Sequence, residues 1–365
     1  MPDGHAIAII IFLVTYTVLA VGKIPWFRID RTGAAVAGGA AMVIFGVLSE
    51  SEAAHSVDYH TLVLLFGMMI VVANLQLSGA FAIFARSMLK RARSGPGLLA
   101  MTIAASGVLA AFFINDVVCL ALTPLFIQAA RMLDEDPVPM LMGVATAANI
   151  GSTATITGNP QNMIVAGFAH LGYASFAAHL APVSIVGLVI DYFVILVVYR
   201  SRLHRDDKRS AMRRVRPPRT NRPLLIKSSI VSAAAVLLFV LGYPTHLVAV
   251  GAGTALLFTR RIKPARIYKL IDWTMLAMFA GLFIVIAGFE TTGFEHYVIE
   301  RIGISHLGNP IVLSTAVAVL SNLVSNVPAV LLFRPLYPIM RVPHFAILIA
   351  SASTLAGNLT VVGSI

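Results

Sequence analysis

The sequence predicts an all-α membrane protein that crosses the bilayer many times. Hydrophobic residues make up 58% of its 365 positions, charged residues make up only 12%, and the mean hydropathy is +0.87. These values lie outside the range of soluble globular domains. Apolar runs of bilayer-spanning length recur along the chain, with Gly and Ala scattered through them as close helix packing in lipid requires. We therefore expect a polytopic helical bundle.

The expected elements fall into two sets separated by a basic loop. Before the loop we expect helices over 5–21, 33–48 and 61–79, a polar-tipped hairpin over 97–131, a broken segment over 138–168 and a helix over 183–199. After the loop we expect helices over 224–241, 247–258 and 273–289, a second hairpin over 311–340 and a second broken segment over 344–365.

The basic residues lie in loops between the apolar runs, which explains a net charge of +11 without a nucleic acid partner. The densest loop, "RSRLHRDDKRSAMRRVRPPRTNR" (200–222), is expected on the cytoplasmic side, which places the N-terminus outside. The first Lys, Lys23, follows the first apolar run, so this run is expected to be a retained helix and not a signal peptide. A bacterial inner membrane fits this pattern.

Two stretches of the chain are related by an internal repeat. "DYHTLVLLFGMMIVVANLQLSG" (58–79) aligns without gaps to "DWTMLAMFAGLFIVIAGFETTG" (272–293), which pairs Gly67 with Gly281. By the positive-inside rule, the two copies cross the membrane in opposite directions. Inverted repeats of this kind are typical of secondary transporters. We expect one repeat over 1–199 and the other over 224–365, joined by the linker 200–223.

The polar stretch "ANIGSTATITGNPQN" (148–162) interrupts the first broken segment. Backbone without helical hydrogen bonds survives in lipid only where it lines a protein-enclosed or watery cavity, so this stretch is expected to form part of a binding site. Its candidate residues are Asn149, Gly151, Ser152, Thr153, Thr155, Gly158, Asn159, Pro160 and Asn162. The related stretch "LAGNLTVVG" (355–363) supplies Asn358, Thr360 and Gly363.

The two hairpin tips also correspond to each other. "FINDVVCLALTPL" (113–125) aligns with "VSNVPAVLLFRPL" (324–336), and because each apolar arm is too short for two separate spans we expect re-entrant hairpins. The candidate residues at the tips are Asn115, Asp116, Ser325, Asn326 and Pro328. We expect both tips and both breaks to enclose one central site, with helix N-termini for an anion and neutral oxygens for Na⁺. Polar contacts between helices are the alternative role for each of these side chains.

Acidic residues inside the membrane have several possible roles. Asp116 is a candidate proton or Na⁺ group, with capping of the following helix as the alternative. Asp191, in "GLVIDYFVILVV", is expected to pack or to form an interhelical hydrogen bond, with a coupling role as the alternative. Glu290, Glu295 and Glu300 are expected to be solvated at the outer rim.

Three motifs together resemble the ion transporter superfamily, which contains arsenite permeases, citrate transporters, divalent anion:sodium symporters and sodium/proton antiporters. The motifs are "NIGSTATITGNPQNMIV", "NDVVCLALTPL" and "SNVPAVLLFRPL", and the resemblance extends from about Asp58 to the C-terminus. It implies scaffold helices that hold two transport units, each with a hairpin and an unwound helix, in a dimer that works by an elevator motion.

The same resemblance suggests roles for particular residues. In the symporter branch a Ser-Asn-Thr tip binds Na⁺ and substrate, which assigns this role to Asn115 and to Ser325 with Asn326. The implied Na⁺ ligands are Asn115, Gly158 and Asn162 in one site, and Asn326, Asn358 and Gly363 in the other. Neither tip is a complete Ser-Asn-Thr, so the chain is more similar to the arsenite permease and antiporter branches. The second copy ends where the partner of Gln161 and Asn162 would follow, and we expect a shortened second repeat.

These observations predict a secondary active transporter, with no enzymatic activity and no cofactor, that moves a small anion or oxyanion coupled to Na⁺ or H⁺. The alternative within the same fold is a Na⁺/H⁺ antiporter that uses Asp116 as its exchanging carboxylate. A passive channel is a weaker alternative because inverted repeats with paired hairpins favour alternating access. An intramembrane hydrolase using Asp116 and Asp191 has no supporting nucleophile motif. The expected partners are the anionic substrate, the lipid bilayer and a second copy of the chain.

Overall fold

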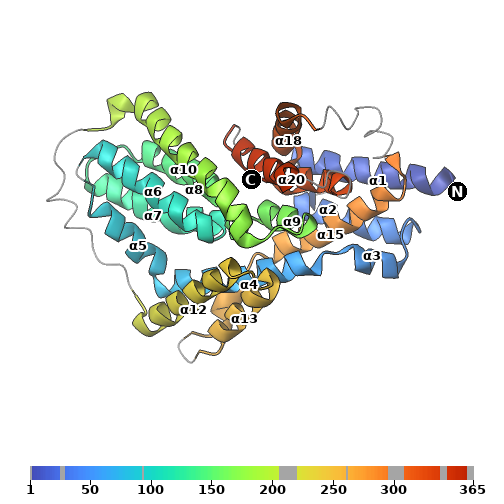
Figure 1. Cartoon of the computed structure of the whole chain (residues 1–365), viewed down its shortest axis with the longest axis horizontal. Helices are drawn as coiled ribbons and strands as arrows, with labels where there is room; N and C mark the ends of the chain where they lie inside the picture. Colours follow the sequence, from blue (N-terminus) through green and yellow to red (C-terminus); the bar gives the residue numbers. More distant parts are fainter. Residues whose placement is uncertain are drawn as a thin grey trace. The chain divides into compact units, whose positions relative to one another are not determined.

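The computed structural model describes residues 2–24, 29–92, 94–204, 220–259, 262–294, 308–337 and 343–359. Nearly all regular structure in these ranges is helical (Figure 1). Six helices in these ranges are long and apolar enough to span a membrane: Gly4–Val21, Tyr59–Ser78, Gly95–Phe112, Tyr173–Val198, Arg222–Val240 and Trp273–Glu290. The expected all-α polytopic membrane fold is confirmed.

The chain forms two compact units, which are described separately here. Unit 1 comprises Met1–Leu65, Met163–Leu171 and Asp272–Ile365. Its elements are α1 (Pro2–Val21), the antiparallel strands β1 (Lys23–Ile24) and β2 (Ile29–Asp30), α2 (Arg31–Ile44), α3 (Glu50–Ser56), the start of α4 (Tyr59–Ser78), the end of α9 (Pro160–Phe168), α15 (Trp273–Glu290), α18 (Pro310–Val324), α19 (Asn326–Leu332), η3 (Arg334–Leu336) and α20 (Pro343–Ala356).

Unit 2 comprises Phe66–Asn162 and Gly172–Ile271. Its elements are the rest of α4, α5 (Ala80–Leu89), α6 (Gly95–Phe112), α7 (Asn115–Met132), α8 (Pro137–Ser152), η1 (Ile156–Gly158), the start of α9, α10 (Tyr173–Val198), η2 (Arg200–Arg202), α12 (Arg222–Val240), α13 (Thr245–Leu257) and α14 (Pro264–Tyr268). In Figure 1, α6, α7 and α8 lie side by side, and α10 packs on α8.

Both predicted hairpins and the first predicted break form at the expected places. The first hairpin consists of α6 and α7, and the second consists of α18 and α19. The first broken segment consists of α8, η1 and α9. With 18 residues, α6 is long enough to be a span by itself. The expectation that each hairpin arm is too short is therefore wrong for α6, and re-entry of the hairpins stays a prediction.

Other predicted boundaries were wrong. The helix expected at 183–199 is α10, which begins ten residues earlier, at Tyr173, and contains Pro182. Proline in a helix costs a backbone hydrogen bond, but polar neighbours can satisfy the freed groups in membrane helices. Two segments expected as loops are helical. The stretch between the predicted helices 33–48 and 61–79 forms α3, which Ser49 and Glu52 cap reciprocally. The stretch between the predicted helix 61–79 and the first hairpin contains α5, which buries Phe81 and Leu89.

Each unit contains a close helix crossing of the same kind, in which a glycine of one helix touches the backbone of another. In unit 2, a Cβ on Gly67 would lie 2.5 Å from the carbonyl carbon of Ala249, so α4 and α13 touch through their backbones. In unit 1, a Cβ on Gly281 would lie 2.6 Å from the carbonyl carbon of Ala35, so α15 and α2 touch in the same way. Ala35 and Ala249 are separated by the same interval as Gly67 and Gly281, so the repeat extends to the partners of these glycines.

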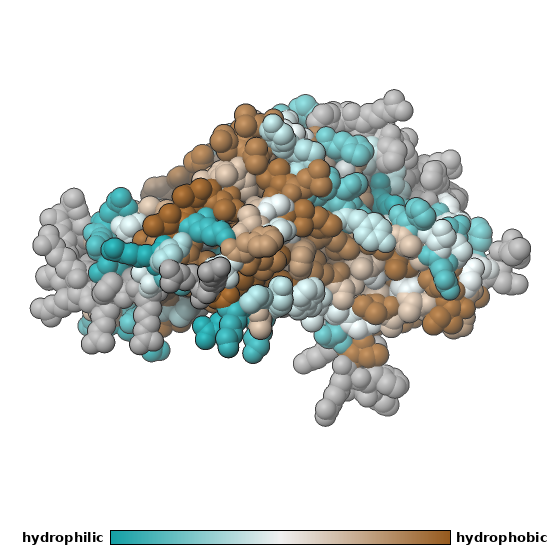
Figure 2. All heavy atoms as spheres, turned by 90° about the horizontal axis from the view of Figure 1, so that it is seen from below, coloured by the Kyte–Doolittle hydropathy of each residue, from teal (hydrophilic) through white to brown (hydrophobic). Residues whose placement is uncertain are grey.

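Hydrophobic side chains occupy much of the protein face in Figure 2. The longest span, α10, leaves a row of large apolar side chains exposed, which includes Ile185, Val189, Phe193 and Val197. In water such a surface would be unfavourable, whereas in a bilayer it contacts lipid chains. The surface of the molecule therefore agrees with its membrane-spanning helices.

Candidate functional site

The first break is the most deeply buried polar part of unit 2. α8 ends at Ser152, η1 follows at Ile156–Gly158, and α9 starts at Pro160. Every residue from 147 to 166 is buried. Irregular backbone at this depth needs internal partners for its N–H and C=O groups.

Two asparagine side chains supply many of these partners. The amide Nδ2 of Asn162 donates to the carbonyl oxygens of Ser152 (3.0 Å) and Thr155 (2.9 Å). The amide Nδ2 of Asn159 donates to the Oγ of Ser152 (2.9 Å), and its Oδ1 accepts from the backbone N–H of Asn162 (2.8 Å). The end of α8 and the start of α9 are thus joined by side-chain hydrogen bonds. The interruption of the helix is therefore a specific, hydrogen-bonded structure and not a frayed helix end.

Two threonines fasten the break to the end of α6. The hydroxyl of Thr155 donates to the carbonyl of Ala111, and the hydroxyl of Thr157 donates to the carbonyl of Phe112 at 3.2 Å. The hydroxyl of Thr157 also lies 3.0 Å from that of Tyr173 at the start of α10. Thr157 and Tyr173 were not among the predicted site residues. The place of Thr157 within the polar stretch could have identified it, whereas nothing in the sequence pointed to Tyr173.

Two predicted glycines allow close backbone packing at the break. A Cβ on Gly158 would lie 2.1 Å from the carbonyl oxygen of Ser152, and a Cβ on Gly151 would lie 2.3 Å from the carbonyl oxygen of Gly107 in α6. Any larger residue would collide with backbone at both positions. The break and the first hairpin are therefore in direct contact, as the sequence analysis expected for residues of one site.

The first tip lies just beyond these contacts. α6 ends at Phe112, and α7 starts at Asn115 with Asp116 in its first turn. The Oδ1 of Asn115 is a buried acceptor for which the described residues supply no donor. Ile114 is the N-cap residue of α7 and provides no side-chain cap, while Asp116 is exposed on the helix. A carboxylate in the first turn is favoured by the helix dipole.

The second tip, in unit 1, has a strained backbone. Ser325 joins α18 to α19 with φ = +76°, a conformation that is uncommon for a residue other than glycine. Asn326 starts α19 and is buried together with Pro328. Strain of this kind costs about 1–3 kcal/mol and occurs preferentially at functional sites. The strained position coincides with the Ser-Asn pair that the sequence analysis selected.

The second break begins after α20. The amide of Asn322 in α18 donates to the carbonyl of Ala356, the last residue of α20, at 3.1 Å. Asn322 therefore fastens the second hairpin to the second broken segment, and the sequence analysis missed it. Asn358 lies in the turn after α20, while Thr360 and Gly363 lie outside the described residues. The single central site stays a prediction, since the first tip and break belong to unit 2 and the second tip and α20 to unit 1.

The sequence profile of the family described as "Citrate transporter" (CitMHS) matches residues 16–356 of this chain. The chain belongs to the citrate transporter family.

The relatives of this citrate transporter family member that are described here are named as a transporter or as an inner membrane protein. It is similar to the silicon efflux transporter LSI3 of rice, with 26% identity over 94% of this chain and 84% of the relative. It is similar to the inner membrane protein YbiR of Escherichia coli, with 28% identity over 83% of this chain and 78% of the relative. The crystal structure of the YdaH transporter of Alcanivorax borkumensis shares the fold, with a TM-score of 0.59, 16% identity, and coverage of 96% of this chain and 87% of that one. The protein is a membrane transporter and not an enzyme.

This member of the citrate transporter family also has a partly buried cation, Arg334, at the start of η3, which follows α19. The Nε of Arg334 lies 3.6 Å from a carboxylate oxygen of Glu290, and the guanidinium lies 5.5 Å from the centre of the Phe168 ring. Glu290 is therefore ion-paired, which corrects the expectation that solvent alone accounts for it; Glu295 and Glu300 lie outside the described residues. The Nη1 of Arg334 and the hydroxyl of Tyr337 are buried donors that find no acceptor among the described residues.

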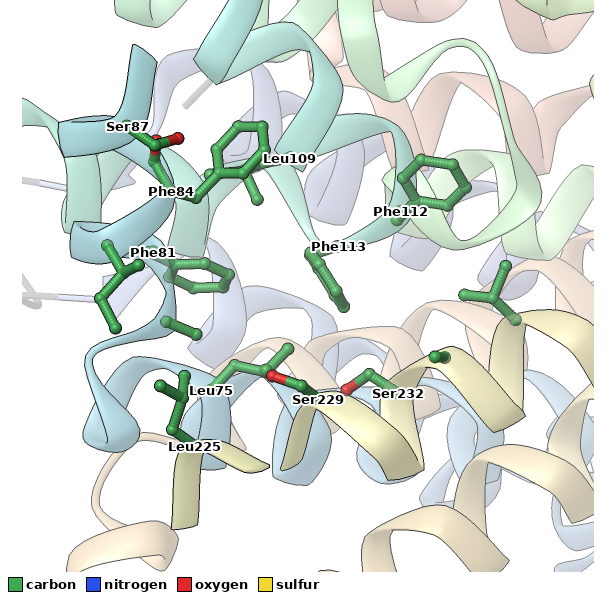
Figure 3. A pocket seen from close by; sticks show the side chains of 14 residues that line it. Leu75, Phe81, Phe84, Ser87, Leu109, Phe112, Phe113, Leu225, Ser229 and Ser232 are labelled. Atoms are coloured by element: carbon green, nitrogen blue, oxygen red, sulfur yellow. The ribbon is translucent and has the colours of Figure 1, made fainter. Parts of the chain in front are cut away.

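An apolar cavity of about 700 Å³ lies beside the first tip of this family member (Figure 3). Phe81 and Phe84 of α5, Phe112 and Phe113 at the end of α6, and Ser232 of α12 are among its lining residues. Aromatic and aliphatic side chains provide most of the lining, so the cavity does not suit a small hydrated anion. The transported substrate is therefore not expected in this cavity.

Proposed function

We propose that this protein is a secondary active transporter that moves a small anion or oxyanion, coupled to Na⁺ or H⁺, by an elevator-type alternating-access motion. The observation that carries the proposal is the buried irregular backbone between α8 and α9. Asn159 and Asn162 hold this backbone together, and Thr155 and Thr157 bond it to the end of α6 at the first tip. Non-helical backbone at membrane depth, placed beside a helix tip, suits ion binding and not passive packing.

The unpaired acceptor on Asn115 supports a cation at the first tip. A buried amide oxygen without a donor is unfavourable, and a Na⁺ ion would supply the missing partner. Neutral amide and carbonyl oxygens are ligands that hard cations prefer. The Na⁺ sites implied by the family resemblance, with Asn115, Gly158 and Asn162 in one and Asn326, Asn358 and Gly363 in the other, are therefore part of this proposal.

Two unpaired donors support an anionic substrate. The Nη1 of Arg334 and the hydroxyl of Tyr337 come from the same short segment, and no described residue supplies an acceptor to either. A carboxylate or oxyanion would provide acceptors for both. The family description names citrate, and the rice relative is named for silicon efflux. Carboxylates and oxyacids are consequently the first substrates to test.

A second candidate function is Na⁺/H⁺ antiport with Asp116 as the exchanging carboxylate. The observation in its favour is the exposed position of Asp116 in the first turn of α7, one residue from the Asn115 amide. Replacement of Asp116 by Asn would abolish antiport. Anion uptake that survives this replacement would favour the leading proposal.

Purified protein in liposomes provides the direct test. Uptake of radiolabelled citrate, succinate, sulfate, arsenite and silicic acid is compared under an imposed Na⁺ gradient, an imposed pH gradient and no gradient. We expect uptake of at least one anion to depend on one gradient, and Asn115→Ala and Asn326→Ala to abolish that dependence. The control is Thr17→Val, because the Thr17 hydroxyl is exposed and, among the described residues, bonds only to the carbonyl of Leu13 in its own helix. Uptake that ignores every gradient would overturn the proposal.

The proposal includes the orientation and assembly expected from the sequence. We propose that the protein lies in a bacterial inner membrane as a homodimer, with its N-terminus outside and the loop 200–222 in the cytoplasm. The single cysteine, Cys119, allows a cysteine-free background in which single cysteines on either side are labelled with an impermeant maleimide. Labelling of the loop from outside intact cells would reject this orientation.

A further inference from the structure

Asp191 is a carboxylic acid in the middle of a membrane-spanning helix. It lies in α10, between residues such as Ile190 and Phe193, and is only 8% exposed. Its hydrogen-bond partner is the hydroxyl of Thr146 in α8, at 3.0 Å, which agrees with the expected interhelical hydrogen bond. No Lys, Arg or His of the described residues forms an ion pair with it.

The hydrogen bonds of Thr146 indicate the protonation state of this acid. The hydroxyl oxygen of Thr146 lies 2.8 Å from the carbonyl oxygen of Met142 and 3.0 Å from the Oδ2 of Asp191. A hydroxyl has one proton, and both a carbonyl and an ionised carboxylate only accept. If Asp191 were ionised, the single hydroxyl proton of Thr146 would have to be shared between two acceptors, which weakens both contacts. If Asp191 is protonated, it donates to Thr146 while Thr146 donates to Met142, and both contacts are satisfied.

No other charge near Asp191 would stabilise its ionised form. The elements α6, α8 and η1, which pack on α10, contain no titratable residue. On α12, Arg222 starts the helix, and the ammonium of Lys227 donates to the carbonyl of Phe258 in the direction of α13. In η2, Arg200 and Arg202 follow Asp191 by 9 and 11 residues, which corresponds to about 14 and 16 Å along the helix axis at 1.5 Å per residue, and Arg202 pairs with Asp136.

The remaining titratable groups of α10 are also engaged elsewhere or neutral. The hydroxyl of Tyr173 contacts Thr157, and the Nδ1 of His179 bonds to the carbonyl of Ser175 in its own helix. Tyr192 follows Asp191 directly and packs against the hydrophobic core of unit 2. An isolated charge in such surroundings is expensive, so the neutral acid is the stable form.

Protonation of Asp191 acts on the half-helix that ends at the break. Polar contacts between α10 and α8 include the Asp191–Thr146 bond and a bond of 3.0 Å from the Ser184 hydroxyl to the carbonyl of Ile150. Ile150 lies two residues before the end of α8 at Ser152. Loss of the proton would require Thr146 to turn away from Met142, so ionisation changes the contact that fixes α8.

We propose that Asp191 is the proton-binding residue that couples transport to a pH gradient: release of its proton turns the Thr146 hydroxyl from Met142 to Asp191, and so changes the hydrogen bonding of α8 next to the ion-binding break. The coupling part of this inference rests on the proposed function, whereas the protonation part does not.

Infrared spectroscopy tests the protonation directly. We expect purified protein near neutral pH to show the C=O stretching band of a protonated carboxylic acid that Asp191→Asn removes and Asp116→Asn leaves in place. Thr146→Val, which is nearly isosteric, should shift the frequency of this band because the acid loses its partner. A spectrum of the wild type without a band that depends on Asp191 would overturn the proposal. The shift with Thr146→Val keeps the test decisive if the Asp191 variant does not fold.

Transport in liposomes tests the coupling. Flux controlled by one proton changes by up to about tenfold per pH unit, and we expect Asp191→Asn to remove this dependence while flux itself persists. Ser184→Ala is the matched control, because it removes another hydrogen bond between α10 and α8 without removing a titratable group. An unchanged pH profile in Asp191→Asn would overturn the coupling role. A wild type that carries no tested anion under any gradient would reject the proposed function, while the infrared band would still decide whether Asp191 binds a proton.

Discussion

The hydroxyl of Tyr16 in α1 donates a hydrogen bond of 3.0 Å to the carbonyl oxygen of Pro328, two residues past Asn326 of the second tip. The bond joins residues 312 positions apart and is buried. The ring of Tyr16 also stacks on that of Phe12. The Phe12 ring in turn stacks on that of Phe289 in α15, with 4.0 Å between the ring centroids. The first helix therefore forms part of the support of the second tip.

Tyr16→Phe should weaken this support without disturbing the aromatic stack. The loss of one buried hydrogen bond corresponds to about 1 kcal/mol in the free energy of unfolding. We also expect a change in the ion concentration that gives half-maximal uptake, because Pro328 is next to the proposed ion ligands. Thermal unfolding in detergent and uptake in liposomes measure the two effects. Thr17→Val, on the exposed side of the same helix, should change neither, and equal behaviour of the two variants would show that the bond has no role.

Gly158→Ala should be one of the most damaging small substitutions in unit 2. The added methyl group would lie 2.1 Å from the carbonyl oxygen of Ser152, which is backbone and cannot turn away. Overpacking of this severity costs about 3 kcal/mol or more. Gly251→Ala in α13 is the control because nothing lies within 4 Å of its added methyl group. Unfolding temperatures provide the measurement, and similar values for the two variants would contradict the close packing at the break.

Asn162→Asp should abolish coupled uptake, although the substitution only exchanges the side-chain NH₂ group for an oxygen. The amide of Asn162 is a donor to two backbone carbonyls, and a carboxylate cannot donate to either. Asn309→Asp is a matched control, because the Oδ1 of Asn309 accepts from the backbone N–H of Ile311 to cap α18, a role in which Asp is as good as Asn. Full uptake with Asn162→Asp would show that its donor role is dispensable.

The start of α8 should lose stability only in strong acid. The pKa of Asp136 lies below its ordinary value of 3.8. The main cause is the hydrogen bond from the backbone N–H of Val138, and Arg202 makes a smaller contribution. A carboxyl with a lowered pKa stabilises the folded state at any pH above 3.8, and this contribution disappears as the pH falls through the lower folded value. The unfolding temperature of the wild type should therefore decrease as the pH is lowered below 3.8, and Asp136→Asn should reduce this decrease. Identical acid profiles would exclude Asp136 from this role.

The hairpins and the first break could be predicted from the sequence because each is marked by polar, Gly and Pro residues within apolar runs. Asn115 and Asn326 both begin a helix directly after a tip, as their alignment predicted. The helices α3 and α5 could not be predicted in this way, because they are short and lie within polar loops. Asn322 could not be selected either, since its partner at Ala356 depends on how α18 packs on α20, which no local pattern encodes.

The repeat was predicted only in part, and the part that was missed gives a further prediction. The sequence paired Gly67 with Gly281, but it did not reveal that their partners, Ala249 and Ala35, are paired by the same shift. Gly39 and Gly253 extend the match, since each approaches the backbone of the repeat glycine in its own unit, Gly281 and Gly67. Weak sequence similarity in small, apolar helices hid this second pairing.

Gly67→Ala and Gly281→Ala should therefore destabilise the protein by similar amounts. Each added methyl group would lie within 2.6 Å of a backbone carbonyl carbon across a helix crossing, which costs about 1–3 kcal/mol or more. Since the two crossings belong to different units, the losses should add in the double variant. Thermal unfolding of the two single variants and of the double variant tests this. A large loss in one single variant with none in the other would show that the two crossings are not equivalent, and that the duplicated glycines do not carry the same packing role.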